Sequence, residues 1–154
     1  AALRYMQRVG HYEFGLDRRP LNLGDGRGVA EVQSLWQQGR EVEGWALYWA
    51  QVHGALIARL SIDPALREAT LLVSYEALCG EPAAMLRRIH AQARLPVADA
   101  EIDRLAARIR APAYYRLPFD AEEQKTIRRL TGETFARLSR LTAQDWGAGQ
   151  AKRA

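Results

Sequence analysis

One short apolar run interrupts a chain whose other apolar residues recur at helical spacing. Leu71, Leu72 and Val73 stand between the polar residues Thr70 and Ser74. An apolar run of this length, bounded by polar residues, predicts a buried β-strand near 69–75. A lone strand cannot satisfy its own backbone N–H and C=O groups. We therefore expect this strand to pair with strands that these 154 residues do not supply.

The residues before the run predict a long helix. From Val29 onward, apolar side chains recur every three or four residues. Gly39 and Gly44 each weaken a helix by about 1 kcal/mol relative to alanine, so we expect a break near them. Asp63-Pro64 ends the pattern. The apolar stripe consists of Val42, Trp45, Trp49, Val52, Leu56 and Leu60.

Three helix starts can be recognised after the run. Pro82 suits a first helical position, where its missing N–H costs nothing, and opens a helix to about residue 94. Asp99 is the expected N-cap of a second helix that ends before Pro112. Asp120 and Glu123 form a variant of the capping box at the start of a third. The segment is therefore expected to be mostly α-helical, with about one strand.

Length and composition indicate a single globular region. We place an irregular N-terminal segment at 1–28, the main region at 29–146 and a disordered tail at 147–154. The single Cys79 rules out an internal disulfide and fits a reducing cytoplasm. No apolar run is long enough to span a bilayer, and the first residues do not open a signal peptide. We expect a cytoplasmic protein with no membrane span.

The formal net charge is +4, and almost all of the basic residues are arginines. Arginine pairs bidentately with phosphate and sulfate, so one interpretation is recognition of such anions or of nucleic acid. The arginines are instead spread along the chain and interleaved with acidic residues, which favours solvated helix faces. We expect no nucleic-acid partner.

The order of elements around the run carries a family resemblance. A strand, then Tyr75-Glu76-x-Leu78, then Pro82 and a helix, resembles the C-terminal half of nucleotide-dependent sulfotransferases of bacterial type. Trp45-Ala46-Leu47-Tyr48-Trp49 upstream and 114–118 downstream extend the resemblance to roughly 36–141. It implies an α/β, P-loop-like fold in the whole enzyme, with the strand in a parallel sheet. It also implies sulfuryl transfer from 3′-phosphoadenosine 5′-phosphosulfate to a hydroxyl or amine acceptor, with no metal.

Part of the family pattern is missing from this chain. The family holds the phosphosulfate with a Gly-rich loop that carries Lys or Arg, and no such strand–loop–helix signal occurs here. Arg18-Arg19-Pro20 follows no apolar strand and is not a match for the 3′-phosphate site. The resemblance therefore implies the C-terminal part of an enzyme whose N-terminal half, with the catalytic base, lies elsewhere. We expect these 154 residues alone to be inactive.

The resemblance implies two nucleotide-binding residues. Tyr75 would contact the adenine, although a tyrosine that caps a buried strand is an equally open interpretation. Arg116 would lie near the 3′-phosphate. No catalytic residue is assigned, because the resemblance implies that the base lies in the N-terminal half. His53 falls on the apolar stripe of its helix, His90 is expected at the surface near a helix end, and His11 lies in a loop with nothing to pair with it.

Two further features each have a functional and a structural interpretation. The cluster of Trp45, Tyr48 and Trp49 could stack on a base or an acceptor ring, but its helical spacing favours a core position. The loop 24–28 could cradle an anion, but no strand precedes it, which favours a flexible loop. A non-catalytic helical module that binds a protein partner through its apolar stripes is the alternative function.

Overall fold

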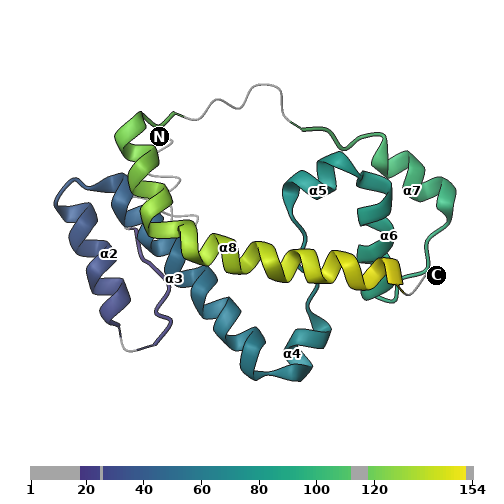
Figure 1. Cartoon of the computed structure of the whole chain (residues 1–154), viewed down its shortest axis with the longest axis horizontal. Helices are drawn as coiled ribbons and strands as arrows, with labels where there is room; N and C mark the ends of the chain where they lie inside the picture. Colours follow the sequence, from purple (N-terminus) through teal and green to yellow (C-terminus); the bar gives the residue numbers. More distant parts are fainter. Residues whose placement is uncertain (1–17, 25, 112–117, 152–154) are drawn as a thin grey trace, which may run out of the picture. The chain divides into compact units, whose positions relative to one another are not determined.

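The computed structural model describes residues 18–24, 26–111 and 118–151, and these residues form helices joined by short connections (Figure 1). The expectation of a mostly α-helical segment is confirmed. The chain divides into two compact units. The first contains Ala1–Arg59 and Phe119–Arg137, and the second contains Leu60–Pro118 and Leu138–Ala154. The long helices α3 (Glu41–Ile62) and α8 (Ala121–Ala151) contribute residues to both units.

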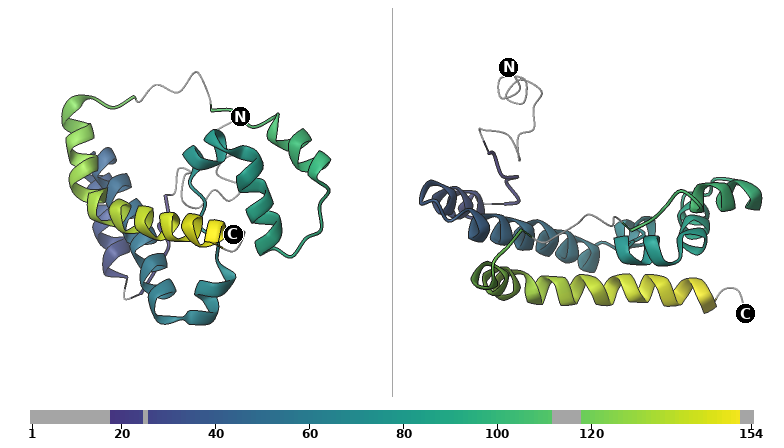
Figure 2. Two further views of the ribbon diagram at one scale, coloured as in Figure 1. Left: turned by 45° about the vertical axis from the view of Figure 1, so that its right-hand side comes forward. Right: turned by 90° about the horizontal axis from the view of Figure 1, so that it is seen from above.

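In the first unit, helices α2 (Arg27–Gln37) and α3 lie side by side (Figures 1 and 2). They are separated at Gly39, whose φ of +74° lies in the left-handed region that glycine tolerates best. The expected break is therefore confirmed at Gly39. Gly44 lies inside α3 and does not break it.

The core of the first unit is an aromatic cluster between these two helices. Trp36 of α2 packs on Trp45 of α3, with ring centroids 4.6 Å apart, and meets Tyr48 edge-on at 6.4 Å. The buried Val32 lies in the same cluster. The Tyr48 hydroxyl accepts a hydrogen bond from the Leu21 N–H at 3.1 Å. Tyr48 is therefore a core residue, as the spacing predicts, and Trp45 packs against this core while partly buried.

Gly44 allows α2 and α3 to approach each other closely. A Cβ atom added at Gly44 would lie 2.4 Å from Cδ1 and Nε1 of the Trp36 ring. A Cβ atom added at Gly54, further along α3, would meet no described atom within 4 Å other than the nearby backbone of its own helix. A side chain is thus excluded at Gly44 but not at Gly54.

We expect Gly44→Ala and Gly54→Ala to change stability in opposite directions. Overpacking against Trp36 should lower the free energy of unfolding by about 1–3 kcal/mol at Gly44. At Gly54 the better helix propensity of alanine should raise it by about 0.5–1 kcal/mol. Urea denaturation followed by far-UV circular dichroism measures both. A stabilised Gly44→Ala variant would contradict the packing of Trp36 on α3.

Residues of α8 join the first unit through ion pairs as well as apolar contacts. Arg129 donates to Glu43 at 3.2 Å, and Glu43 also accepts from Arg40. The hydrogen bond from Arg40 is the largest cause that lowers the pKa of the Glu43 carboxyl. At its start α8 carries the expected capping box, because the Asp120 carboxylate accepts from the Glu123 N–H at 2.8 Å and Glu123 accepts from the Asp120 N–H at 2.9 Å.

The second unit contains four short helices and the end of α8 (Figure 1). These short helices are α4 (Pro64–Ala69), α5 (Tyr75–Gly80), α6 (Pro82–Gln92) and α7 (Asp99–Ala106). Pro82 opens α6 as predicted. Asp99 is already the first residue of α7 rather than its N-cap, which is Ala98, and α7 ends at Ala106, earlier than expected.

The core of the second unit is small. Met85 of α6 and Ile102 of α7 are its fully buried large side chains. Arg87 of α6 reaches the carboxylates of Asp99 and Asp103 in α7, at 3.0 and 3.3 Å. These two contacts pair helices that follow each other in the sequence.

The predicted strand near 69–75 is not formed. Helix α4 continues to Ala69 and α5 begins at Tyr75, so 70–74 form a connection with extended backbone at Thr70 and Ser74. The expected burial is also wrong, because Val73 is 37% exposed. The physical reason is pairing: no strand occurs in the described parts of the chain, so the segment has no hydrogen-bond ladder to join. The expected boundaries at 28 and 146 stay predictions, and α8 itself continues through Ala151.

Candidate functional site

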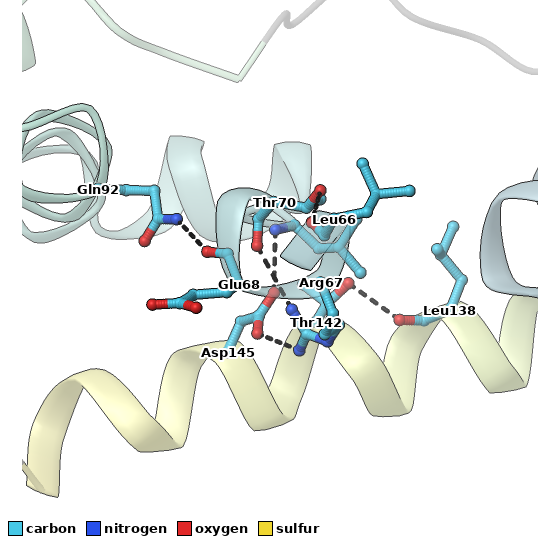
Figure 3. A network of polar contacts seen from close by, with 9 residues as sticks. Leu66, Arg67, Glu68, Thr70, Gln92, Leu138, Thr142 and Asp145 are labelled. Atoms are coloured by element: carbon cyan, nitrogen blue, oxygen red, sulfur yellow. Dashed lines mark hydrogen bonds and ion pairs between the residues drawn. The ribbon is translucent and has the colours of Figure 1, made fainter. Parts of the chain in front are cut away.

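The connection 70–74, here called the extended segment because its backbone is extended at Thr70 and Ser74, and the Tyr75 that follows it form the candidate site. Both belong to the second unit. Figure 3 shows how the segment is held at its start. The Arg67 guanidinium makes an ion pair with Asp145 of α8 and also donates to the Thr70 carbonyl at 3.3 Å. The other Asp145 oxygen accepts from the Leu72 N–H at 3.0 Å. One carboxylate therefore fixes both the end of α4 and the extended segment.

Neighbouring hydrogen bonds complete this network (Figure 3). The Thr70 hydroxyl donates to the Leu66 carbonyl at 2.7 Å, which closes the last turn of α4. The Gln92 side chain donates to the Glu68 carbonyl at 2.7 Å and so ties α6 to α4. The Asp145 side chain is only 11% exposed. A carboxylate this sheltered is stable where it has partners, and here it has two.

The segment is fixed at its other end by a helix cap. The Ser74 hydroxyl accepts from the Ala77 N–H at 3.0 Å, so Ser74 is the N-cap and Tyr75 the first residue of α5. Glu76 lies in the first turn of α5, where a negative charge is favourable. The Tyr75 side chain is 56% exposed. The interpretation of Tyr75 as a buried cap of a strand is therefore wrong.

This arrangement presents an extended backbone and an exposed aromatic ring next to each other. Both ends of the segment are held, while Val73 within it is exposed. No strand lies beside this segment in the described residues, and its backbone groups other than the Leu72 N–H are suited to pair with one. The Tyr75 ring offers a face on which a planar group can stack.

The other predicted residues do not join this site. Arg116 and His11 lie outside the described residues. His53 is in α3 and stacks on Trp49 at 4.1 Å, with its Nδ1 2.8 Å from the Trp49 carbonyl oxygen, which is a structural position. The expected surface position of His90 is wrong for its Nδ1, which is buried in α6 and has no hydrogen-bond partner among the described residues.

The remaining predicted features also have structural positions. Arg18 makes an ion pair with Glu41 and lies over the Trp36 ring at 5.8 Å. Gly26 of the Gly-rich loop, with a φ of +79°, is the N-cap of α2. In the parts of the chain that the structure describes, no three His, Cys, Asp or Glu side chains gather as metal ligands. None of the described helices is both long and apolar enough to cross a membrane.

Sequence reasoning missed Asp145 and Arg67. The available signal was the position of Asp145, four residues after Leu141 and seven after Leu138 on the apolar face of the last helix. An acidic residue on such a face requires a partner. No periodicity identifies Arg67 as that partner, because the two residues are 78 positions apart.

Comparison with known proteins yields no relative: no protein-family model, no curated protein and no solved structure matches this chain.

Proposed function

We propose that the chain is the C-terminal part of a bacterial-type sulfotransferase that uses 3′-phosphoadenosine 5′-phosphosulfate as its donor. The observation that supports the proposal is the extended segment 70–74, which is held at both ends, lies beside no strand in the described residues, and is followed directly by the exposed Tyr75. In this function the segment is a strand of a parallel sheet within an α/β, P-loop-like fold. Open α/β sheets bind nucleotides beyond the carboxyl ends of their strands, which is where Tyr75 would lie.

The proposed partner of the segment is the N-terminal half of the same protein. That half would supply the neighbouring strands, the Gly-rich loop with its cation and the catalytic base. Apolar side chains on the segment favour such pairing, because Val73 would lose its exposure to water. The enzyme would work in the cytoplasm without a metal and transfer the sulfuryl group to a hydroxyl or amine of an acceptor.

Two residues of this chain have proposed roles. The Tyr75 ring stacks on the adenine, for which its exposed face is suited. Arg116 pairs with the 3′-phosphate through its guanidinium, an assignment that rests on the sequence resemblance alone. Neither residue takes part in the transfer itself, which needs cations around the phosphosulfate and a base at the acceptor.

The test is donor binding by the protein that includes its N-terminal half. We expect Tyr75→Ala to weaken 3′-phosphoadenosine 5′-phosphate binding about tenfold, because one aromatic contact of about 1–2 kcal/mol is lost. Tyr75→Phe keeps the ring and should be milder. Leu95→Ala is the control, since Leu95 is similarly exposed in the same unit but lies outside the site. Calorimetry measures all four proteins.

Three outcomes would count against the proposal. Equal nucleotide affinity for wild type and Tyr75→Ala would remove Tyr75 from the site. An upstream coding sequence without a strand and a Gly-rich loop carrying Lys or Arg would remove the enzyme. Turnover by these 154 residues alone, in a radiolabelled sulfate-transfer assay, would contradict the need for that loop, because losing a single such donor costs on the order of 10²–10³ in rate.

A second candidate function, a helical module that binds a protein partner, is favoured by one observation. Phe135 in the first unit is 60% exposed beside an apolar hollow. If the chain is such a module, Tyr75→Ala should leave its affinity for the protein partner unchanged. This result would separate protein binding from sulfuryl transfer.

A further inference from the structure

The first unit contains a hollow that the proposed sulfuryl transfer does not use. It lies between α3 and the first half of α8, has a volume of about 530 Å³, and is here called the aromatic groove. Volumes between 300 and 1,000 Å³ are typical of sites for small molecules. Its lining residues are Glu41, Val42, Trp45, Ala46, Trp49, Phe119, Ile127, Thr131 and Phe135.

Two of its aromatic rings are held in place by other rings of the first unit. Trp45 packs on Trp36 at 4.6 Å and approaches Tyr48 at 6.1 Å. Trp49 stacks on His53 at 4.1 Å with an interplanar angle of 25°. Rings that are already fixed lose little conformational entropy when a ligand binds, so the groove is preorganised on its α3 side.

The carboxylate and the hydroxyl of the groove already have partners. Glu41 is the one ionisable residue among the described lining residues, and its carboxylate makes an ion pair with Arg18. The Thr131 hydroxyl donates to the Ile127 carbonyl at 2.8 Å, within α8 itself. An anion would meet no cation among these lining residues, and a cation would have to displace Arg18 from Glu41. Either ion would also lose hydration. The groove is complementary to a neutral ligand.

We propose that the aromatic groove is a binding site for a neutral small molecule with two or three aromatic rings. The volume limits its size, and four aromatic residues provide faces and edges for offset or edge-to-face contacts. Trp45 and Trp49 contribute from α3, while Phe135 contributes from α8 and Phe119 from just before it. This binding is independent of sulfuryl transfer and would persist in a protein that has no such activity.

A matched pair of fluorescent probes tests the chemistry. N-Phenyl-1-naphthylamine is neutral and fluoresces in apolar surroundings, and 8-anilinonaphthalene-1-sulfonate adds one negative charge to the same ring system. The net charge of +4 would attract the anion to the protein as a whole. We expect the neutral probe to bind one site per chain, with energy transfer from tryptophan, and about tenfold more tightly than the anion.

A pair of variants tests the location. Phe135→Ser removes one aromatic residue of the groove and should weaken the neutral probe about tenfold. Phe135 is 60% exposed, so the fold should survive the change, and an unchanged melting curve verifies this. Leu95→Ser is the control, because Leu95 is 58% exposed and does not line the groove. It should leave the affinity unchanged.

Several results would overturn the proposal. Equal neutral-probe affinity for Phe135→Ser and wild type would place the probe elsewhere. Tighter binding of the anion would contradict the neutral character of the site. A dimer in analytical ultracentrifugation that dissociates on Phe135→Ser would assign the groove to a second copy of the chain instead.

Discussion

Replacing Trp36 by alanine should lower the free energy of unfolding by about 3–5 kcal/mol. Trp36 is 8% exposed and packs on Trp45 and Tyr48, and its ring excludes any side chain at Gly44. Removing it leaves a cavity between α2 and α3 that these rigid helices cannot readily close. Because proteins are stable by only about 5–15 kcal/mol, this loss is a large fraction of the total stability, and the urea midpoint should fall sharply.

Two variants isolate the cause of this loss. Trp36→Phe keeps most of the packing and removes the Trp36 Nε1–H, which is buried and has no hydrogen-bond partner in the described parts of the chain. It should therefore cost clearly less than Trp36→Ala. Ile62→Ala on α3 is the control, because Ile62 is 72% exposed and should change stability by no more than about 0.5 kcal/mol. Urea denaturation followed by far-UV circular dichroism gives all three values. Equal midpoints for Trp36→Ala and wild type would contradict the aromatic core.

Replacing Asp145 by alanine should destabilise the second unit by about 2–4 kcal/mol. The substitution leaves the Arg67 guanidinium without its ion pair and the Leu72 N–H without its acceptor. Partly buried polar groups that lose a partner cost more than the net gain of the bond itself. Hydrogen exchange should show faster exchange of the Leu72 amide in particular.

Asp145→Asn and Glu133→Ala provide the comparison. Asparagine keeps one carbonyl acceptor of the same shape but loses the charge, so its effect should lie between wild type and Asp145→Ala. Glu133 is an exposed acidic residue on the same helix, and its removal should change little. Unchanged Leu72 exchange in Asp145→Ala would show that the extended segment is held by other contacts.

Asp145 should also affect the candidate site, because it holds the backbone that leads to Tyr75. Asp145 lies far along the chain from Tyr75, yet it holds the segment that ends at the Ser74 cap. In the proposed enzyme, Asp145→Ala should therefore weaken nucleotide binding indirectly, by releasing the backbone that positions Tyr75. Arg67 acts at the same point, so the two substitutions should be strongly non-additive.

The sequence by itself determined those features that depend on residues within about one helical turn. Pro82 opens α6, Gly39 separates α2 from α3, and the box of Asp120 and Glu123 caps α8, because each acts on backbone groups next to it. The helical spacing also predicted that Trp45 and Tyr48 belong to the core. These interactions are local, so the pattern of residues is sufficient to predict them.

Tertiary structure decided the rest, because it depends on groups far apart in the chain. The run Leu71 to Val73 has the composition of a strand, but a strand exists only where another strand offers hydrogen bonds, and 70–74 are instead held by a carboxylate of α8. The partnership of Arg67 with Asp145, the approach of Trp36 to Gly44, and the groove between α3 and α8 arise in the same way. Local propensity determines which conformations have a low free energy, and long-range contacts select among them.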